Sequence, residues 1–132
     1  LTMFAIKRIK LSKWKKEENV NKILENVENA KRALKYDENE SARECYYKIK
    51  EFFRLVPEGF RKYIKKEVKR IRIGIDRRDI IGFVKEYDKA DLQNRTEDKK
   101  KLFEEIKKTY KRLPKKDQTK VYNKLFRKSL DF

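Results

Sequence analysis

Lys and Arg side chains, gathered in three blocks, are the residues of this chain best suited to chemistry, and that chemistry is the binding of anions. Of 132 residues, 39 are Lys or Arg, 22 are Asp or Glu and none is His, which gives a formal net charge of +17. Residues 1–16 hold six bases and no acid, residues 61–78 nine bases and two acids, and residues 99–128 thirteen bases and three acids. Such an excess destabilises a compact chain by self-repulsion. The composition therefore indicates an anionic polymer or surface as the partner.

The clearest of these blocks falls on a predicted helix over residues 58–72. Helical periodicity places Phe60, Ile64 and Val68 on one side, and the bases fill the other side with only Glu67 between them. A helix face that serves solubility alone normally mixes the two signs through pairs three or four residues apart. We therefore predict a nucleic-acid-binding face whose residues are Arg61, Lys62, Lys65, Lys66, Lys69 and Arg70.

Two further groups of bases are candidates for the same role. One surrounds a predicted turn and consists of Lys111, Arg112, Lys115 and Lys116. The other is the basic N-terminal arm, residues 1–19, in which Trp14 stands near Lys10 and Lys13. An amphipathic ring such as that of Trp14 suits stacking on an unpaired base, insertion at lipid headgroups or docking on the helices, and the sequence leaves all three open.

Catalysis is not expected from these residues. Without His the chain lacks the commonest general acid or base near neutral pH. Cys45 is the single cysteine and lies on the apolar side of a predicted helix, so we expect it to be buried and slow to react. The acidic run from Asp37 to Glu40 is predicted to cap a helix rather than to bind a metal. With no glycine-rich phosphate loop either, we predict a non-enzymatic protein without cofactor or metal.

The elements that carry these residues are predicted to be helices throughout. Three Gly and two Pro leave few tight turns for an all-β fold, whereas apolar residues recur at helical spacing from Val20 onward. Asp37 with Glu40, and Asn94 with Glu97, have the spacing of capping boxes. Helix ends are expected at Pro57, Gly74 and Pro114. The result is an all-α fold of six helices, forming a single helical domain over residues 20–132.

The second half of the sequence repeats the pattern of the first after 57 residues. This offset superimposes Ile23 on Ile80, Ile49 on Ile106 and Pro57 on Pro114, together with the paired caps at Asp37 and Asn94. The halves differ elsewhere, for example where Phe60 meets Asp117. We predict two tandem three-helix units, residues 20–72 and 77–129, packed as one six-helix bundle.

From these features we expect a protein that binds DNA or RNA through Lys/Arg faces with little sequence preference. No zinc finger, basic zipper or helix-turn-helix with a polar recognition helix can be identified in the sequence, so contacts with phosphate should dominate. The alternative is a membrane-proximal or scaffolding helical module whose basic face meets anionic lipid or an acidic protein. An apolar segment of about 20 residues directly before Leu1 in a longer parent sequence would favour that alternative. The lone cysteine favours the cytoplasm.

Overall fold

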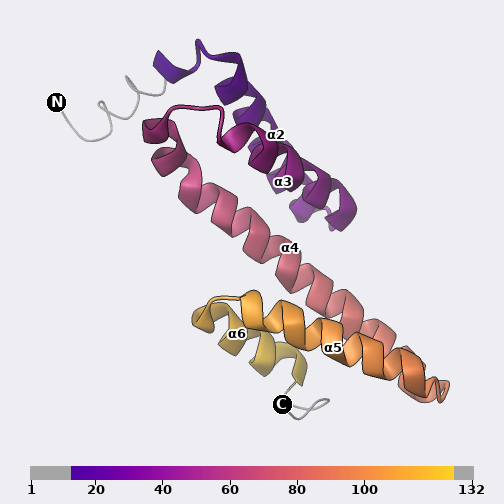
Figure 1. Ribbon diagram of the computed structural model, residues 1–132. Coiled ribbons are helices and arrows are strands. Elements are labelled where there is room, and N and C mark those ends of the chain that lie inside the picture. Colours follow the sequence, from indigo (N-terminus) through magenta and orange to yellow (C-terminus); the bar gives the residue numbers. More distant parts are fainter. Residues whose placement is uncertain (1–12, 127–132) are drawn as a thin grey trace. The chain divides into compact units, whose positions relative to one another are not determined.

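In the computed structural model, described for residues 13–126, the chain is all-helical (Figure 1). Five α-helices follow one another in this part: α2 (Glu18–Lys35), α3 (Asn39–Phe53), α4 (Glu58–Leu92), α5 (Thr96–Arg112) and α6 (Lys115–Val121). A single π-helical turn, η1 (Tyr122–Phe126), continues α6. No strand occurs within residues 13–126, which confirms the predicted all-α class.

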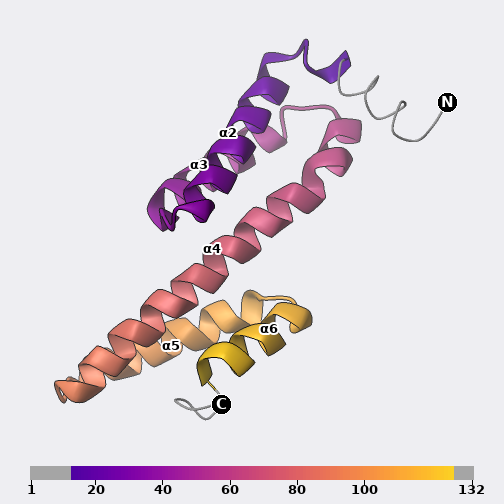
Figure 2. The same ribbon diagram turned by 180° about the vertical axis from the view of Figure 1, so that it is seen from behind.

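The prediction of six helices is wrong at Gly74. The expected third and fourth helices are one continuous helix, α4, which runs through this residue (Figures 1 and 2). A lone Gly inside a helix costs only about 1 kcal/mol relative to Ala, which is too little to end a helix that buries apolar side chains on both sides of the residue. Between Ile71 and Ile80 the buried apolar residues shift from one side of the helix to another. In the sequence alone, such a shift looks like the end of one helix and the start of the next.

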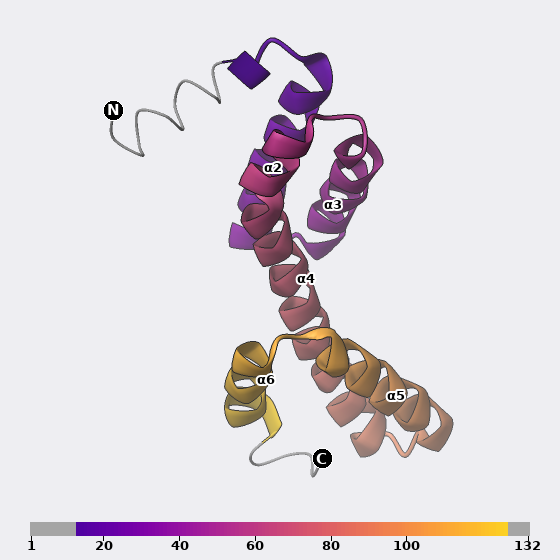
Figure 3. The same ribbon diagram turned by 60° about the vertical axis from the view of Figure 1, so that its left-hand side comes forward.

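Two compact units divide the chain between Arg72 and Ile73. In the first unit, α2 and α3 run side by side (Figures 1 and 3), and both helices and the first half of α4 bury apolar side chains. The fully buried side chains of this unit include Val20, Ile23, Ala30, Ala42, Ile49 and Phe60. In the second unit, the later half of α4 packs against α5 and α6 around Ile80, Val84, Ile106, Leu113 and Val121. That residues 20–132 form a single domain stays a prediction.

The turns after α2 and after the second half of α4 have the same construction. Asp37 and Asn94 adopt left-handed φ angles of 57° and 55°. In each turn the amide of the following residue bonds back into the helix, Glu38 N to Ala33 O at 2.8 Å and Arg95 N to Ala90 O at 2.9 Å. These are the bonds of a Schellman motif, in which a short polar side chain substitutes for the usual Gly.

The predicted helix starts at Asp37 and Asn94 are therefore placed one residue too early. The N-caps of α3 and α5 are Glu38 and Arg95, and neither side chain makes a capping hydrogen bond. Asx residues favour both helix starts and left-handed turns, so their type alone does not distinguish the two positions.

Several local features recur at the offset of 57 residues. The starts of α3 and α5, Asn39 and Thr96, are 57 residues apart, and so are the starts of α4 and α6, Glu58 and Lys115. The same spacing separates the ends of α2 and α4, the two left-handed turn residues, and the buried pairs Ile23 and Ile80, Val27 and Val84, and Ile49 and Ile106.

Gly82 and Gly59 provide a test of how α4 is packed. Gly82 is exposed, and a Cβ added there would meet nothing within 4 Å, so Gly82→Ala should raise the free energy of unfolding by about 0.5 to 1 kcal/mol. At Gly59, a Cβ would lie 3.1 Å from Cζ2 of Trp14, so Gly59→Ala should stabilise less or destabilise. Urea unfolding of both variants measures the difference, and equal gains would contradict the position of Trp14.

Candidate nucleic-acid interface

The six bases predicted to form a binding face lie together on the first half of α4. Helical geometry places them on the side away from Phe60, Ile64 and Ile71, which are buried in the first unit. Arg61 is half-buried, and the other five side chains, Lys62, Lys65, Lys66, Lys69 and Arg70, are exposed. The structure therefore brings these six predicted residues together on one surface.

Ion pairs divide this surface into two parts. Lys62 lies 3.7 Å from Glu58, and Arg70 lies 3.1 Å from Glu67. Among the residues that the structure describes, Lys65, Lys66 and Lys69 take part in no ion pair, and we refer to these three as the unpaired lysine cluster. Because protein carboxylates do not neutralise it, the cluster is the part of the surface most available to phosphate.

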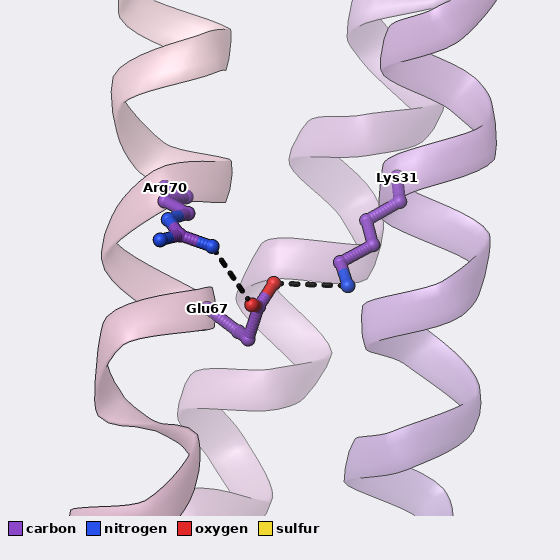
Figure 4. Close-up of polar contacts among 3 residues, drawn as sticks. All are labelled: Lys31, Glu67 and Arg70. Atoms are coloured by element: carbon purple, nitrogen blue, oxygen red, sulfur yellow. Dashed lines mark hydrogen bonds and ion pairs between the residues drawn. The ribbon is translucent and has the colours of Figure 1, made fainter.

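Glu67, the one acid among residues 61–70 of α4, links two helices (Figure 4). Its Oε2 atom lies 2.9 Å from Nζ of Lys31 on α2, and its Oε1 atom accepts a hydrogen bond of 3.1 Å from Nη1 of Arg70. The hydrogen bond from Lys31 is the main reason why the pKa of Glu67 falls below its ordinary value, while partial desolvation opposes that shift. Glu67 thus holds α4 against α2 and remains ionised at neutral pH.

Trp14 packs on the first turns of α4. Its ring lies edge-on to Phe60 with centroids 5.5 Å apart, and 5.8 Å from the ring of Tyr63. The backbone of this segment is held by a bond from Glu17 N to Trp14 O of 2.9 Å. Trp14 is half-buried and its neighbour Lys13 is exposed, whereas Lys10 lies outside the described residues. Of the three roles left open by the sequence, docking on the helices is the one with contacts here, and stacking on a base stays a prediction.

The predicted bases of the second unit surround the turn from α5 to α6. Lys111, Lys115 and Lys116 are exposed. Arg112 differs from them, because its Nη2 atom lies 3.1 Å from Oδ1 of Asp76, a carboxylate of α4 whose side chain is only 7 % exposed. Arg112 therefore joins α5 to α4, which makes it a poorer phosphate ligand than the other three.

Lysines on the face of α5 are engaged with neighbours in the same unit. Lys99 lies 2.6 Å from Asp91 and over the ring of Tyr87, and its hydrogen bond to Asp91 raises its pKa. Lys107 lies over the ring of Phe103, 5.4 Å from the centroid. These contacts make Lys99 and Lys107 less available to phosphate than the unpaired lysine cluster.

A groove between α2 and α4 in the first unit was not foreseen from the sequence. It encloses about 500 Å³ and is lined by Lys15, Lys31, Lys66, Arg70, Tyr63 and the apolar Leu24, among others. Its residues lie up to 55 positions apart in the sequence, from Lys15 to Arg70, so no local pattern could reveal it. The only sequence signal is Tyr63, an aromatic residue at the edge of the apolar stripe of α4.

Cys45 is half-buried rather than buried as predicted, because it lies at the margin of the apolar face of α3. Desolvation raises its pKa, which lowers the thiolate fraction at neutral pH. Within residues 13–126, no three His, Cys, Asp or Glu side chains come together as a metal site. None of the helices described there is both long and apolar enough to cross a membrane.

Replacing Glu67 by Gln should change the dependence of stability on pH. Because the folded pKa of Glu67 lies below its ordinary value of 4.5, the contact stabilises the protein above that pH and is lost as the pH falls through the folded pKa. The side chains are partly exposed, so we expect a loss of less than about 1 kcal/mol at pH 7 that fades as the pH falls below 4.5. Thermal unfolding across this range checks it, and Lys31→Met should give a non-additive double-mutant cycle.

Replacing Arg112 by Ala should destabilise the second unit. The substitution leaves the buried Asp76 carboxylate without this charged donor, and we expect the free energy of unfolding to fall by about 1 to 2 kcal/mol. Lys111→Ala, an exposed neighbour, should change it by less than about 0.5 kcal/mol. Equal effects of the two substitutions in urea unfolding would contradict a structural role of Arg112.

No protein-family model matches the chain, and comparisons with curated proteins and with solved structures gave no match either. The function is therefore argued from the charges, burial and contacts of the chain itself.

Proposed function

We propose that this protein binds nucleic acid, without catalysis, through the Lys/Arg face of α4 that centres on the unpaired lysine cluster. The supporting observation is that Lys65, Lys66 and Lys69 are exposed, adjacent on one face and without carboxylate partners in the described part of the chain. Each phosphate contact by such a side chain releases condensed counterions, which favours binding to a polyanion. By comparison, an ion pair between exposed protein side chains contributes little free energy, so these lysines lose little by being without a carboxylate partner.

The second unit supplies an internal comparison for this face. At the offset of 57 residues, the unpaired lysine cluster corresponds to Tyr122, Asn123 and Phe126. Arg61 and Lys62 correspond in the same way to Gln118 and Thr119. The corresponding segment, α6 with η1, carries its bases at other positions, which are Lys115, Lys116, Lys120 and Lys124. The second unit therefore does not repeat the three lysines of the cluster at the same positions, although it is basic as well.

We also propose that the two units arose by duplication of one three-helix arrangement. The matching helix starts, left-handed turn residues and buried positions support this proposal. Superposition of the two units on each other, with the second half of α4 equivalent to α2, tests it. A different order or handedness of the three helices would refute it.

Recognition by this face is proposed to be largely independent of base sequence. Lys provides a point charge on a flexible stem, which suits phosphate, whereas base edges are usually read by bidentate Arg, Asn or Gln side chains. The unpaired lysine cluster contains none of these, and of the two Arg residues on the face, Arg61 is half-buried and Arg70 is paired with Glu67. The compartment we propose is the cytoplasm, because the single Cys45 cannot form an intramolecular disulfide.

Charge reversal tests the proposed face. Changing Lys65, Lys66 and Lys69 to Glu should weaken binding to any duplex or RNA, and should reduce the slope of log affinity against log salt by roughly 3 on duplex DNA. Helix content should not change, because these side chains are exposed. Fluorescence anisotropy at several salt concentrations, with circular dichroism as a folding check, measures both effects.

The matched control changes three other exposed lysines to Glu, Lys48, Lys85 and Lys101, so that the net charge of the two variants is the same. Equal loss of affinity in both variants would mean that binding follows total charge rather than the face of α4. Unchanged affinity in the first variant would refute the face as a binding site. Anionic vesicles tested in parallel show whether lipid, the alternative partner, binds more tightly than nucleic acid.

A further inference from the structure

The groove between α2 and α4 has the composition of a site for part of a flexible polyanion. Its volume of about 500 Å³ lies within the range of ordinary small-molecule sites, roughly 300 to 1,000 Å³. Leu24 and Val27 of α2, with Ile64 of α4, give it an apolar wall. The groove lies wholly within the first unit and borders the basic face of α4, since Lys66 and Arg70 belong to both.

The charge of the groove is positive in spite of two acids. Four basic side chains, Lys15, Lys31, Lys66 and Arg70, line it together with Glu28 and Glu67. Glu67 is already bonded to both Lys31 and Arg70, at 2.9 and 3.1 Å, so its charge is compensated within the protein. Lys15 and Lys66 are exposed and make no ion pair among the described residues. These two ammonium groups are therefore available to phosphate.

Tyr63 adds an aromatic surface to the same groove. Its side chain is 40 % exposed although it contacts Trp14 and Phe60, with ring centroids 5.8 and 6.1 Å away. The contacts on one side limit the motion of the ring, while its exposed part lines the groove. A fixed aromatic ring between cationic side chains is the arrangement on which proteins stack unpaired bases.

We propose that this groove binds unpaired nucleotides, with a base stacked on Tyr63 and the adjoining phosphates on Lys15 and Lys66. The proposal rests on the proposed function and makes it more specific, because the base of a duplex is already stacked and paired and cannot enter such a groove. The protein would therefore prefer single strands, or duplexes that carry unpaired nucleotides, over fully paired duplexes.

The test compares single-stranded and duplex probes. Tyr63→Leu keeps an apolar side chain against Trp14 but removes the aromatic surface, and should lower the affinity for oligothymidylate about tenfold while leaving that for a fully paired duplex within about twofold. Tyr63→Phe should bind as the wild type does. Tyr47→Leu, which removes an exposed Tyr of α3, is the matched control and should have no effect. Trp14, the single Trp, should show quenched fluorescence when oligothymidylate binds to the wild type.

Each outcome bears on one of the two proposals. If Tyr63→Leu lowers the affinity for single strands and for duplex equally, or lowers neither affinity, the groove does not bind bases. Binding by the face of α4 would still stand in that case. If the wild type binds neither probe, the proposed function fails and the groove proposal fails with it. If Tyr63→Phe loses as much affinity for oligothymidylate as Tyr63→Leu does, the hydroxyl group of Tyr63 accounts for that affinity. The proposed stacking is then refuted.

Discussion

Burial of side chains from α4 is the constraint on which both units depend. Phe60, Ile64 and Ile71 are buried in the first unit, and Ile80 and Val84 belong to the core of the second. Each fully buried large apolar side chain contributes about 1.5 to 3 kcal/mol relative to exposure, so the helix cannot rotate about its axis without losing these contacts. The bases of residues 61–70 are fixed in direction by the same burial, because they occupy the rest of the circumference.

The two acids of the basic block at residues 61–78 lie where α4 meets its neighbours. Glu67 is bonded to Lys31 and Arg70, and Asp76 to Arg112, so each acid joins α4 to a neighbouring helix. In a chain with a net charge of +17, carboxylates at such contacts reduce the repulsion between basic helices. The unpaired lysine cluster makes no such contact among the described residues, and its side chains are exposed to solvent. Self-repulsion and availability for a polyanion are two consequences of the same arrangement.

The sequence predicted those parts of the fold that depend on periodicity. The apolar residues that recur at helical spacing from Val20 onward, among them Ile23 and Val27, predicted α2 and its buried face. Periodicity could not show that α4 continues through Gly74, because two stripes of different phase on one helix look the same as two helices. It also could not assign Asp37 and Asn94 to left-handed turns, since the same side chains favour helix starts.

The candidate site likewise has a part that periodicity could predict and a part that it could not. The six bases of α4 share one helix, so their common face could be derived from spacing alone, whereas the engagement of Arg112 with Asp76 and the groove beside Tyr63 arise from tertiary contacts over 36 and more residues. Charge counting treats all bases as equivalent, and tertiary contacts make them unequal. Within residues 13–126, Lys99 and Arg112 form ion pairs with neighbours in their unit, whereas Lys65, Lys66 and Lys69 form none. Specificity for a polyanion, where a strongly basic protein has any, must therefore come from the bases that folding leaves without carboxylate partners.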